Sequence, residues 1–87
     1  MSSHPTDFQG DILAAIREAV EGAIANSRCE VSGGNGHYAI VVTSPAFAGL
    51  SMVASHRLVY TAIAHLTKGA APPIHAVDTL HTKASSS

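Results

Sequence analysis

The chain has 87 residues and a mass of 8.9 kDa, which allows one domain and excludes a deep, enclosed active site. A chain of this size buries only about 60 to 65% of the surface that its unfolded form exposes. A formal net charge of -1 excludes a global positive field that attracts nucleic acid or anionic membranes. The one cysteine, Cys29, excludes an internal disulfide and an all-cysteine zinc site.

The first element expected along the chain is a helix. Thr6 and Gln9 have the T-x-x-Q spacing of a capping box, which predicts a helix start. Apolar residues then recur at intervals of three and four and form one stripe: Ile12, Leu13, Ile16, Val20, Ala23 and Ile24. We expect this helix to end near Asn26.

A β-hairpin should follow. Residues 28–32 place Cys29 and Val31 on one face of a short strand, and residues 37–43 form a second, more apolar strand. Between them, GGNG supplies residues that tolerate positive φ. The G-x-x-G spacing also occurs in the loop with which KH domains clamp a nucleic-acid backbone. That loop joins two helices, whereas here it turns a hairpin, so we interpret the match as accidental.

A second helix and a third strand complete the pattern. Pro45 stops the second strand, Ser51 is the expected N-cap, and Gly69 should close the helix. Its apolar stripe comprises Val59, Ala62, Ile63 and Leu66. After a connector at residues 70–73, residues 74–82 alternate as in a strand, with Ile74, Ala76, Asp78 and Leu80 on one face and His75, Val77, Thr79 and His81 on the other.

The predicted order is α-β-β-α-β, an α+β fold. Because a helix joins the second and third strands, these should be parallel, and both helices should cover one face of a three-stranded mixed sheet. We expect one domain over residues 1–87, with an ordered core at about 6–83, a polar lead and a frayed Ser-rich tail. With neither a secretion signal nor an apolar run long enough to span a bilayer, a cytoplasmic location is expected, or an organellar one if a transit peptide is missing.

Six histidines are the unusual feature of the composition. His37 opens the second strand and His75 opens the third, so parallel pairing places both imidazoles at the same end of the sheet. They form a candidate two-histidine metal site, which is too small for a closed zinc site unless a partner completes it. From spacing alone, the alternative of two polar strand-end residues stays open. His81 shares a strand face with His75 but lies about 20 Å away at the usual rise, so the two cannot hold one ion.

The sequence gives little support for a hydrolase. Ser51, His56 and Asp78 are the residue types of a catalytic triad, but the G-x-S-x-G nucleophile motif is missing from the sequence. Cys29 lies mid-strand among apolar neighbours, which favours a buried and inert thiol. We therefore expect no enzymatic activity.

Three separated motifs carry a family resemblance. F-x-G-x-S (Phe47, Gly49, Ser51), H-R-L-V-Y (residues 56–60) and I-H-A (residues 74–76) agree in order and spacing with the BolA family. The resemblance covers residues 11–82 and implies a class II KH-like fold. It also implies a non-enzymatic adaptor in iron-sulfur metabolism, which is monomeric alone and binds a monothiol glutaredoxin as a heterodimer. The two proteins would share a [2Fe–2S] cluster with the glutaredoxin cysteine and glutathione, and none is expected in the isolated protein.

The resemblance also assigns roles to residues. His75 carries over as a cluster ligand, whereas the second family ligand is a His or Cys of the hairpin region, where His37 is the nearest candidate. Phe47 and Gly49 would shape the turn, and His56 and Arg57 would lie at a partner surface. The chain departs from the family at Ser55, where an arginine is common, and this should weaken a basic helix surface. It also lacks the tryptophan-containing C-terminal extension. The alternative function is a DNA-binding transcriptional regulator, ranked second because basic residues are few.

Overall fold

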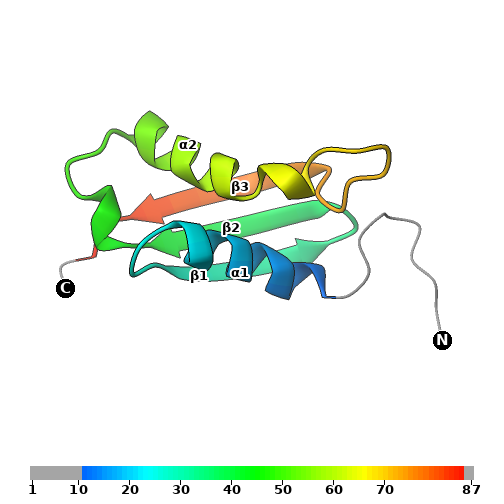
Figure 1. Cartoon of the computed structure of the whole chain (residues 1–87), viewed down its shortest axis with the longest axis horizontal. Helices are drawn as coiled ribbons and strands as arrows, with labels where there is room; N and C mark the ends of the chain where they lie inside the picture. Colours follow the sequence, from blue (N-terminus) through cyan, green and yellow to red (C-terminus); the bar gives the residue numbers. More distant parts are fainter. Residues whose placement is uncertain (1–10, 86–87) are drawn as a thin grey trace.

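The computed structural model describes residues 11–85, whose helices and strands follow the expected α-β-β-α-β order (Figure 1). The main elements are α1 (Ile12–Ala23), β1 (Arg28–Gly34), β2 (His37–Thr43), α2 (Met52–Ala62) and β3 (Ala76–Lys83). Two short 3₁₀ helices, η1 (Pro45–Phe47) and η2 (Ala64–Leu66), flank α2. The sheet order is β1-β2-β3, with β1 antiparallel and β3 parallel to β2. The predicted α+β fold with a mixed sheet is confirmed.

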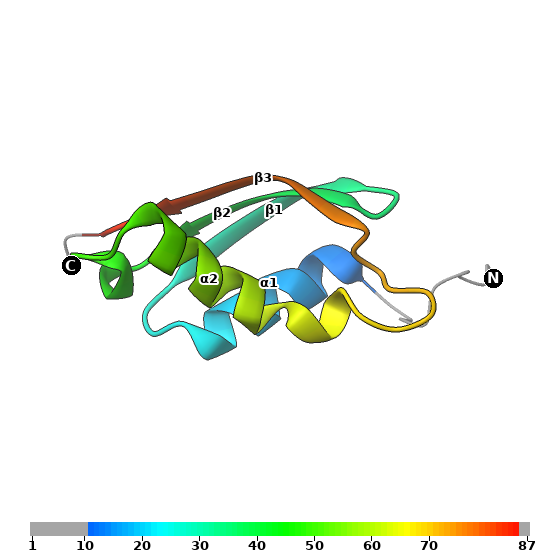
Figure 2. The same ribbon diagram turned by 90° about the horizontal axis from the view of Figure 1, so that it is seen from above.

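Both helices lie on the same face of the sheet, as predicted (Figure 2). The central strand β2 alternates, and Tyr38, Ile40 and Val42 are buried against the helices. The helices contribute one stripe each, and the buried members of these stripes are Ile16 and Val20 in α1 and Val59 in α2. Each helix and the central strand therefore bury one face, and the hydrophobic core lies between the helices and the sheet.

The first helix of the described residues begins at Ile12. Thr6 and Gln9 lie outside the described residues. Within them, Asp11 has extended backbone angles and accepts a hydrogen bond from the Ala14 amide at 3.2 Å, so it is the N-cap of α1. The helix ends at Ala23, and Asn26 then adopts a left-handed conformation with φ 51°.

The second helix ends earlier than expected. Ser51 is its N-cap and accepts from the Ala54 amide at 3.1 Å, in agreement with the prediction. However, α2 stops at Ala62, and the chain continues as η2 rather than as α-helix up to Gly69. A 3₁₀ turn repeats every three residues, which directs Leu66 into the core behind Ile63.

The third strand departs from strict alternation. It begins at Ala76 rather than at Ile74, and a register shift lies where Tyr38 pairs with Val77 but Ala39 pairs with Thr79. Asp78 is the extra residue of this β-bulge. Consequently Val77 and Leu80 both pack against the core, and the predicted sharing of one face by Asp78 and Leu80 is wrong.

Candidate functional site

The hairpin turn between β1 and β2 places His37 at the end of the sheet. Asn35 and Gly36 connect the paired residues Gly34 and His37, and both adopt positive φ values, 55° and 83°. Two left-handed residues make the tight turn that matches the twist of paired strands, and Asn-Gly is the sequence that adopts it most readily. His37 is thus the first residue after a rigid turn.

The backbone of the same turn holds His75. The carbonyl oxygen of Gly36 accepts hydrogen bonds from the amides of His75 at 2.8 Å and Ala76 at 2.9 Å. The imidazole of His75 packs over Gly36 so closely that a Cβ added there would lie 2.7 Å from the His75 Cγ. Only glycine leaves room for this ring, so the turn sequence and the position of His75 depend on each other.

The two imidazoles are neighbours. The ring centroids of His37 and His75 lie 6.5 Å apart with an interplanar angle of 66°. Both side chains are exposed, on the parallel pair of strands in which His37 is opposite Ala76. Parallel pairing therefore brings the two rings together, as expected from the order of the strands.

A third side chain joins this pair and was missed by the sequence interpretation. The Oδ1 atom of Asp78 lies 3.2 Å from Nδ1 of His37. Val77 faces the core beside Tyr38, so Asp78, the next residue of β3, lies on the opposite face, which carries His37. The contact depends on which residues of β2 and β3 pair, so the periodicity of the sequence contains no signal for it.

The described residues form neither a larger metal-binding cluster nor a catalytic triad. Among residues 11–85 no group of three or more His, Cys, Asp or Glu side chains is arranged to hold a metal ion. The Ser51 hydroxyl caps α2 and the Asp78 carboxylate contacts His37, so the triad reading has no geometric support.

Cys29 is a buried thiol. Burial and the nearby Glu21 carboxylate raise the pKa of Cys29 to about 11, and its backbone amide donates to Glu21 Oε2 at 2.9 Å. A thiol with this pKa stays protonated at neutral pH and is a poor nucleophile and metal ligand. The structure thus agrees with the expectation of an inert cysteine.

The F-x-G-x-S segment forms a packed corner at the opposite end of the sheet. Phe47 is buried in the core, and Gly49 has φ 79°. Ser44 is fully buried, where its hydroxyl donates to the Ala25 carbonyl at 2.6 Å and accepts from the Ala46 amide at 3.0 Å. The Ser44 contacts join the loop after α1 to the loop before α2, and Phe47 anchors the segment that follows in the core.

The exposed side of α2 combines apolar and basic groups. Met52 and Val53 are 72% and 64% exposed, and Arg57 and Tyr60 are exposed beside the half-buried His56. A shallow depression of about 300 Å³ runs between Val53, His56, Arg57 and Tyr60. Exposed apolar side chains of this size in one region are typical of protein contact surfaces. We call these residues the α2 surface.

The α2 surface and the histidine pair lie far apart. Ser55, beside His56, shares a hydrogen bond of 2.6 Å with Thr82, near the end of β3. Thr82 is about 20 Å from the start of that strand at the usual rise per residue. The structure thus brings His37 and His75 together but leaves His56 and Arg57 at the other end.

Ser55 itself does not belong to the surface. It is 4% exposed, and its hydroxyl also donates to the Met52 carbonyl at 2.9 Å. The departure at this position was expected to weaken a basic helix surface. Instead, Ser55 contributes a buried hydrogen bond between α2 and β3, so its effect falls on packing.

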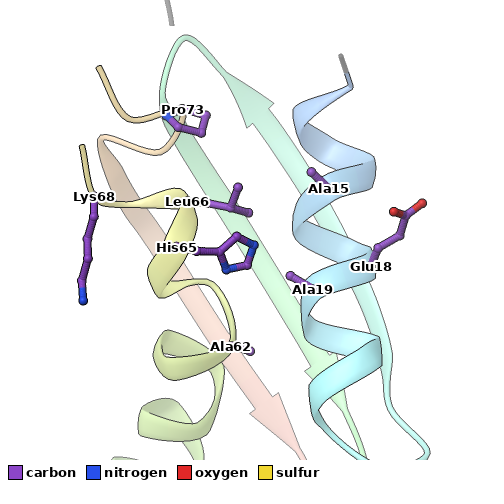
Figure 3. A pocket seen from close by; sticks show the side chains of 8 residues that line it. All are labelled: Ala15, Glu18, Ala19, Ala62, His65, Leu66, Lys68 and Pro73. Atoms are coloured by element: carbon purple, nitrogen blue, oxygen red, sulfur yellow. The ribbon is translucent and has the colours of Figure 1, made fainter. Parts of the chain in front are cut away.

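A larger groove of about 640 Å³ lies between α1 and η2. Its apolar side chains include Ala15, Ala19 and Leu66, and His65 lies between the two helices (Figure 3). Glu18 and Lys68 point away from the groove on either side. Because its polar groups do not converge, the groove lacks the arrangement that binds a specific polar ligand.

Comparison with solved structures defines the class of protein. The fold is similar to a BolA protein homologue from Coxiella burnetii, with a TM-score of 0.70 and 30% identity over 86% of this chain and 92% of that chain. It is also similar to BolA1 from Arabidopsis thaliana (TM-score 0.72, 18% identity, 87% and 94% covered) and to mouse BolA1 (0.64, 29%, 97% and 73%). The two helices on one face of a mixed sheet therefore form a BolA-like α+β fold.

The chain belongs to the BolA-like protein family, whose model matches residues 8–87. This confirms the resemblance drawn from the three motifs. The chain has no match among curated protein sequences. Within the described residues, no helix is both long and apolar enough to cross a membrane.

Proposed function

We propose that this protein is a non-enzymatic adaptor that binds a monothiol glutaredoxin and shares a [2Fe–2S] cluster with it. The observation that carries the proposal is the pair of exposed imidazoles, His37 and His75, 6.5 Å apart on neighbouring strands. Membership of the BolA-like family supports it, because the family resemblance assigns a cluster-ligand role to His75.

The chemistry of the two side chains fits an iron-sulfur centre. Imidazole nitrogen is an established iron ligand, and in Rieske centres two histidines hold one iron of a [2Fe–2S] cluster. Two imidazoles provide half of the four ligands that such a cluster needs. The remaining ligands would come from the glutaredoxin cysteine and glutathione. The cluster would supply redox and cluster-transfer chemistry, while this chain presents and orients two nitrogen ligands.

The α2 surface supplies a second contact region in this proposal. Residues 44–77 contain no Asp or Glu, so His56 and Arg57 lie within a segment that has no acidic side chain. A partner with an acidic rim around an apolar centre would complement the exposed Met52, Val53 and Tyr60. Because Arg57 lies near the end of β3 that is remote from the imidazoles, its loss should weaken association without changing the ligands of the cluster.

Anaerobic reconstitution with glutaredoxin, glutathione, iron and sulfide tests the proposal. We expect a coloured heterodimer on size exclusion, with an absorption spectrum distinct from that of the all-cysteine glutaredoxin homodimer. His75→Ala should abolish or strongly destabilise the shared cluster, and His37→Ala should do so to a lesser extent. His81→Ala is the matched control, because His81 is an exposed imidazole on the same strand.

Two outcomes contradict the proposal. The first is a glutaredoxin that keeps its homodimeric cluster spectrum unchanged when this protein is added. The second is a parental spectrum in His75→Ala together with its loss in His81→Ala or Cys29→Ser, which would move the site to those residues.

DNA binding is the second candidate, and the same acid-free segment is the observation that favours it. Its basic residues are only Arg57 and Lys68, and the net charge of the chain is negative. We therefore expect DNA affinity in the non-specific range, with Kd of about 10⁻⁴ to 10⁻⁶ M at physiological salt. A sequence-selective, salt-resistant complex at nanomolar concentration in a fluorescence anisotropy titration would rank the regulator first.

A further inference from the structure

We propose that Asp78 is a positioning residue for His37. Its carboxylate accepts the Nδ1–H of the imidazole, fixes the ring orientation and leaves Nε2 as the nitrogen that presents a lone pair to a metal. The inference rests on the proposed function for the identity of the metal centre. The state of the His37 ring, however, can be measured without any metal.

The geometry that carries the proposal is the contact between Asp78 Oδ1 and His37 Nδ1, at 3.2 Å. A carboxylate only accepts hydrogen bonds, so the ring nitrogen must be the donor in this contact. In a neutral imidazole that carries its proton on Nδ1, the other nitrogen has the free lone pair. The contact therefore selects one of the two tautomers, and with it the nitrogen available for coordination.

The backbone is shaped to make this contact. Asp78 is the extra residue of the bulge in β3, at the point where the register with β2 shifts between Tyr38 and Ala39. Val77, just before it, faces the core beside Tyr38, so alternation directs Asp78 to the opposite face, which also carries His37. The bulge then returns Leu80 to the core while Asp78 stays on the face of His37.

The arrangement has a known chemical use. Histidines that bind metals commonly donate their second ring N–H to a carboxylate or a carbonyl, which orients the ring and makes the coordinating nitrogen more basic. Since His37 and Asp78 are 56% and 59% exposed in their side chains, the contact contributes little to the stability of the fold. Its value lies in the ring orientation.

Nuclear magnetic resonance of ¹⁵N-histidine-labelled protein tests the inference without a metal. At a pH where the imidazoles are neutral, long-range ¹H–¹⁵N correlations distinguish the two tautomers of each ring. We expect His37 to carry its proton on Nδ1 in the parent. In Asp78→Ala it should shift to the tautomer ratio of His81, the exposed internal control. Asp78→Asn should retain much of the parental state, because the amide oxygen still accepts.

Thr79→Ala is the matched control variant, since Thr79 is the exposed neighbour of Asp78 on β3, and it should leave the His37 signals unchanged. Circular dichroism would verify the fold of each variant, and the isosteric Asp78→Asn serves if Asp78→Ala does not fold. An Nε2–H tautomer of His37 in the parent, or an unchanged His37 tautomer in Asp78→Ala, overturns the proposal.

Cluster retention separates this inference from the proposed function. After reconstitution with glutaredoxin, Asp78→Ala should lose the cluster to a chelator at about 10- to 100-fold lower concentration than the parent, as is usual for loss of such a carboxylate. Equal retention in the two proteins overturns the role of Asp78 toward the metal. If the parent forms no shared cluster while its tautomer responds to Asp78, the proposed function fails and the positioning of the ring stands.

Discussion

The two ends of the β2–β3 pair are built in opposite ways. At the end near Thr43, the side chains of Phe47, Ser44 and Ser55 are buried and hydrogen-bonded or packed against the core. At the end near His37, the side chains of His37 and His75 are exposed and lie beside the tight turn of the hairpin. We call these the packed end and the turn end.

This difference indicates which residues contribute to the stability of the fold and which contribute to the ligand geometry. Residues of F-x-G-x-S at the packed end determine how the loop and α2 seat on the sheet, so their replacement should change the free energy of unfolding. Residues at the turn end gain little from burial, so their replacement should change ligand geometry instead. A clean separation of the two effects across variants would support the comparison.

Phe47→Ala should have the largest effect. Removing a buried phenylalanine ring costs about 3–5 kcal/mol in free energy of unfolding, because lost burial and the remaining cavity add together. Urea denaturation followed by circular dichroism measures it. Leu50→Ala in the same segment is the control, because Leu50 is 42% exposed and should change stability by much less. Equal losses in the two variants would show that the corner is not packed as described.

Cys29 at the packed end predicts an alkaline loss of stability. Its thiol pKa is raised from 9.0 to about 11 in the folded state, so the unfolded state releases the proton first. Below pH 9 the thiol is protonated in both the folded and the unfolded state, so it does not change the free energy of unfolding. Between pH 9 and 11 the free energy of unfolding should fall by up to about 2 kcal/mol. In Cys29→Ala, urea denaturation at pH 7 to 11 should show a smaller fall. An equally steep fall in both proteins would assign the alkaline loss to other groups.

Replacement of single glycines by alanine compares the backbone at the two ends. Gly36→Ala should cost about 1–2 kcal/mol for the left-handed backbone and should also displace the His75 ring. Gly49→Ala has a similar φ of +79° but nothing within 4 Å of the added Cβ, so only the backbone cost is expected. Gly34→Ala meets no atom within 4 Å and should be nearly neutral. Denaturation combined with the imidazole chemical shifts of His75 measures both effects.

The His75 signals of these glycine variants show whether the turn backbone holds the His75 ring. A shift of the His75 signals in Gly36→Ala but not in Gly49→Ala would show that the turn backbone holds the ring. Similar His75 signals in all three variants would show that the ring position does not depend on the turn.

The smallest expected effects are those of the exposed side chains at the turn end. His75→Ala and Asp78→Ala should each change the free energy of unfolding by only about 0.5 kcal/mol, the usual range for surface substitutions. Thermal denaturation should therefore give nearly parental midpoints. A large destabilisation by either variant would mean that the turn end also holds the fold together, and the separation between the two ends would fail.

The sequence alone determined the type and order of the elements and the proximity of the two imidazoles. Apolar periodicity marks both helices, Asn35 and Gly36 specify a tight turn, and the amphipathic helix between the second and third strands makes them parallel. Parallel pairing of strands that begin near His37 and His75 is enough to bring these side chains to one end. Such features depend on local propensity and on chain connectivity, which a single sequence contains.

Only the tertiary structure decided the contacts that complete the site. The contact of Asp78 with His37 arises from the register between β2 and β3, and the burial of Ser55 arises from α2 lying on β3. Each of these depends on residues that are distant in sequence. Alternation and helical period treat each element alone, so they contain no information on how one element shifts against another.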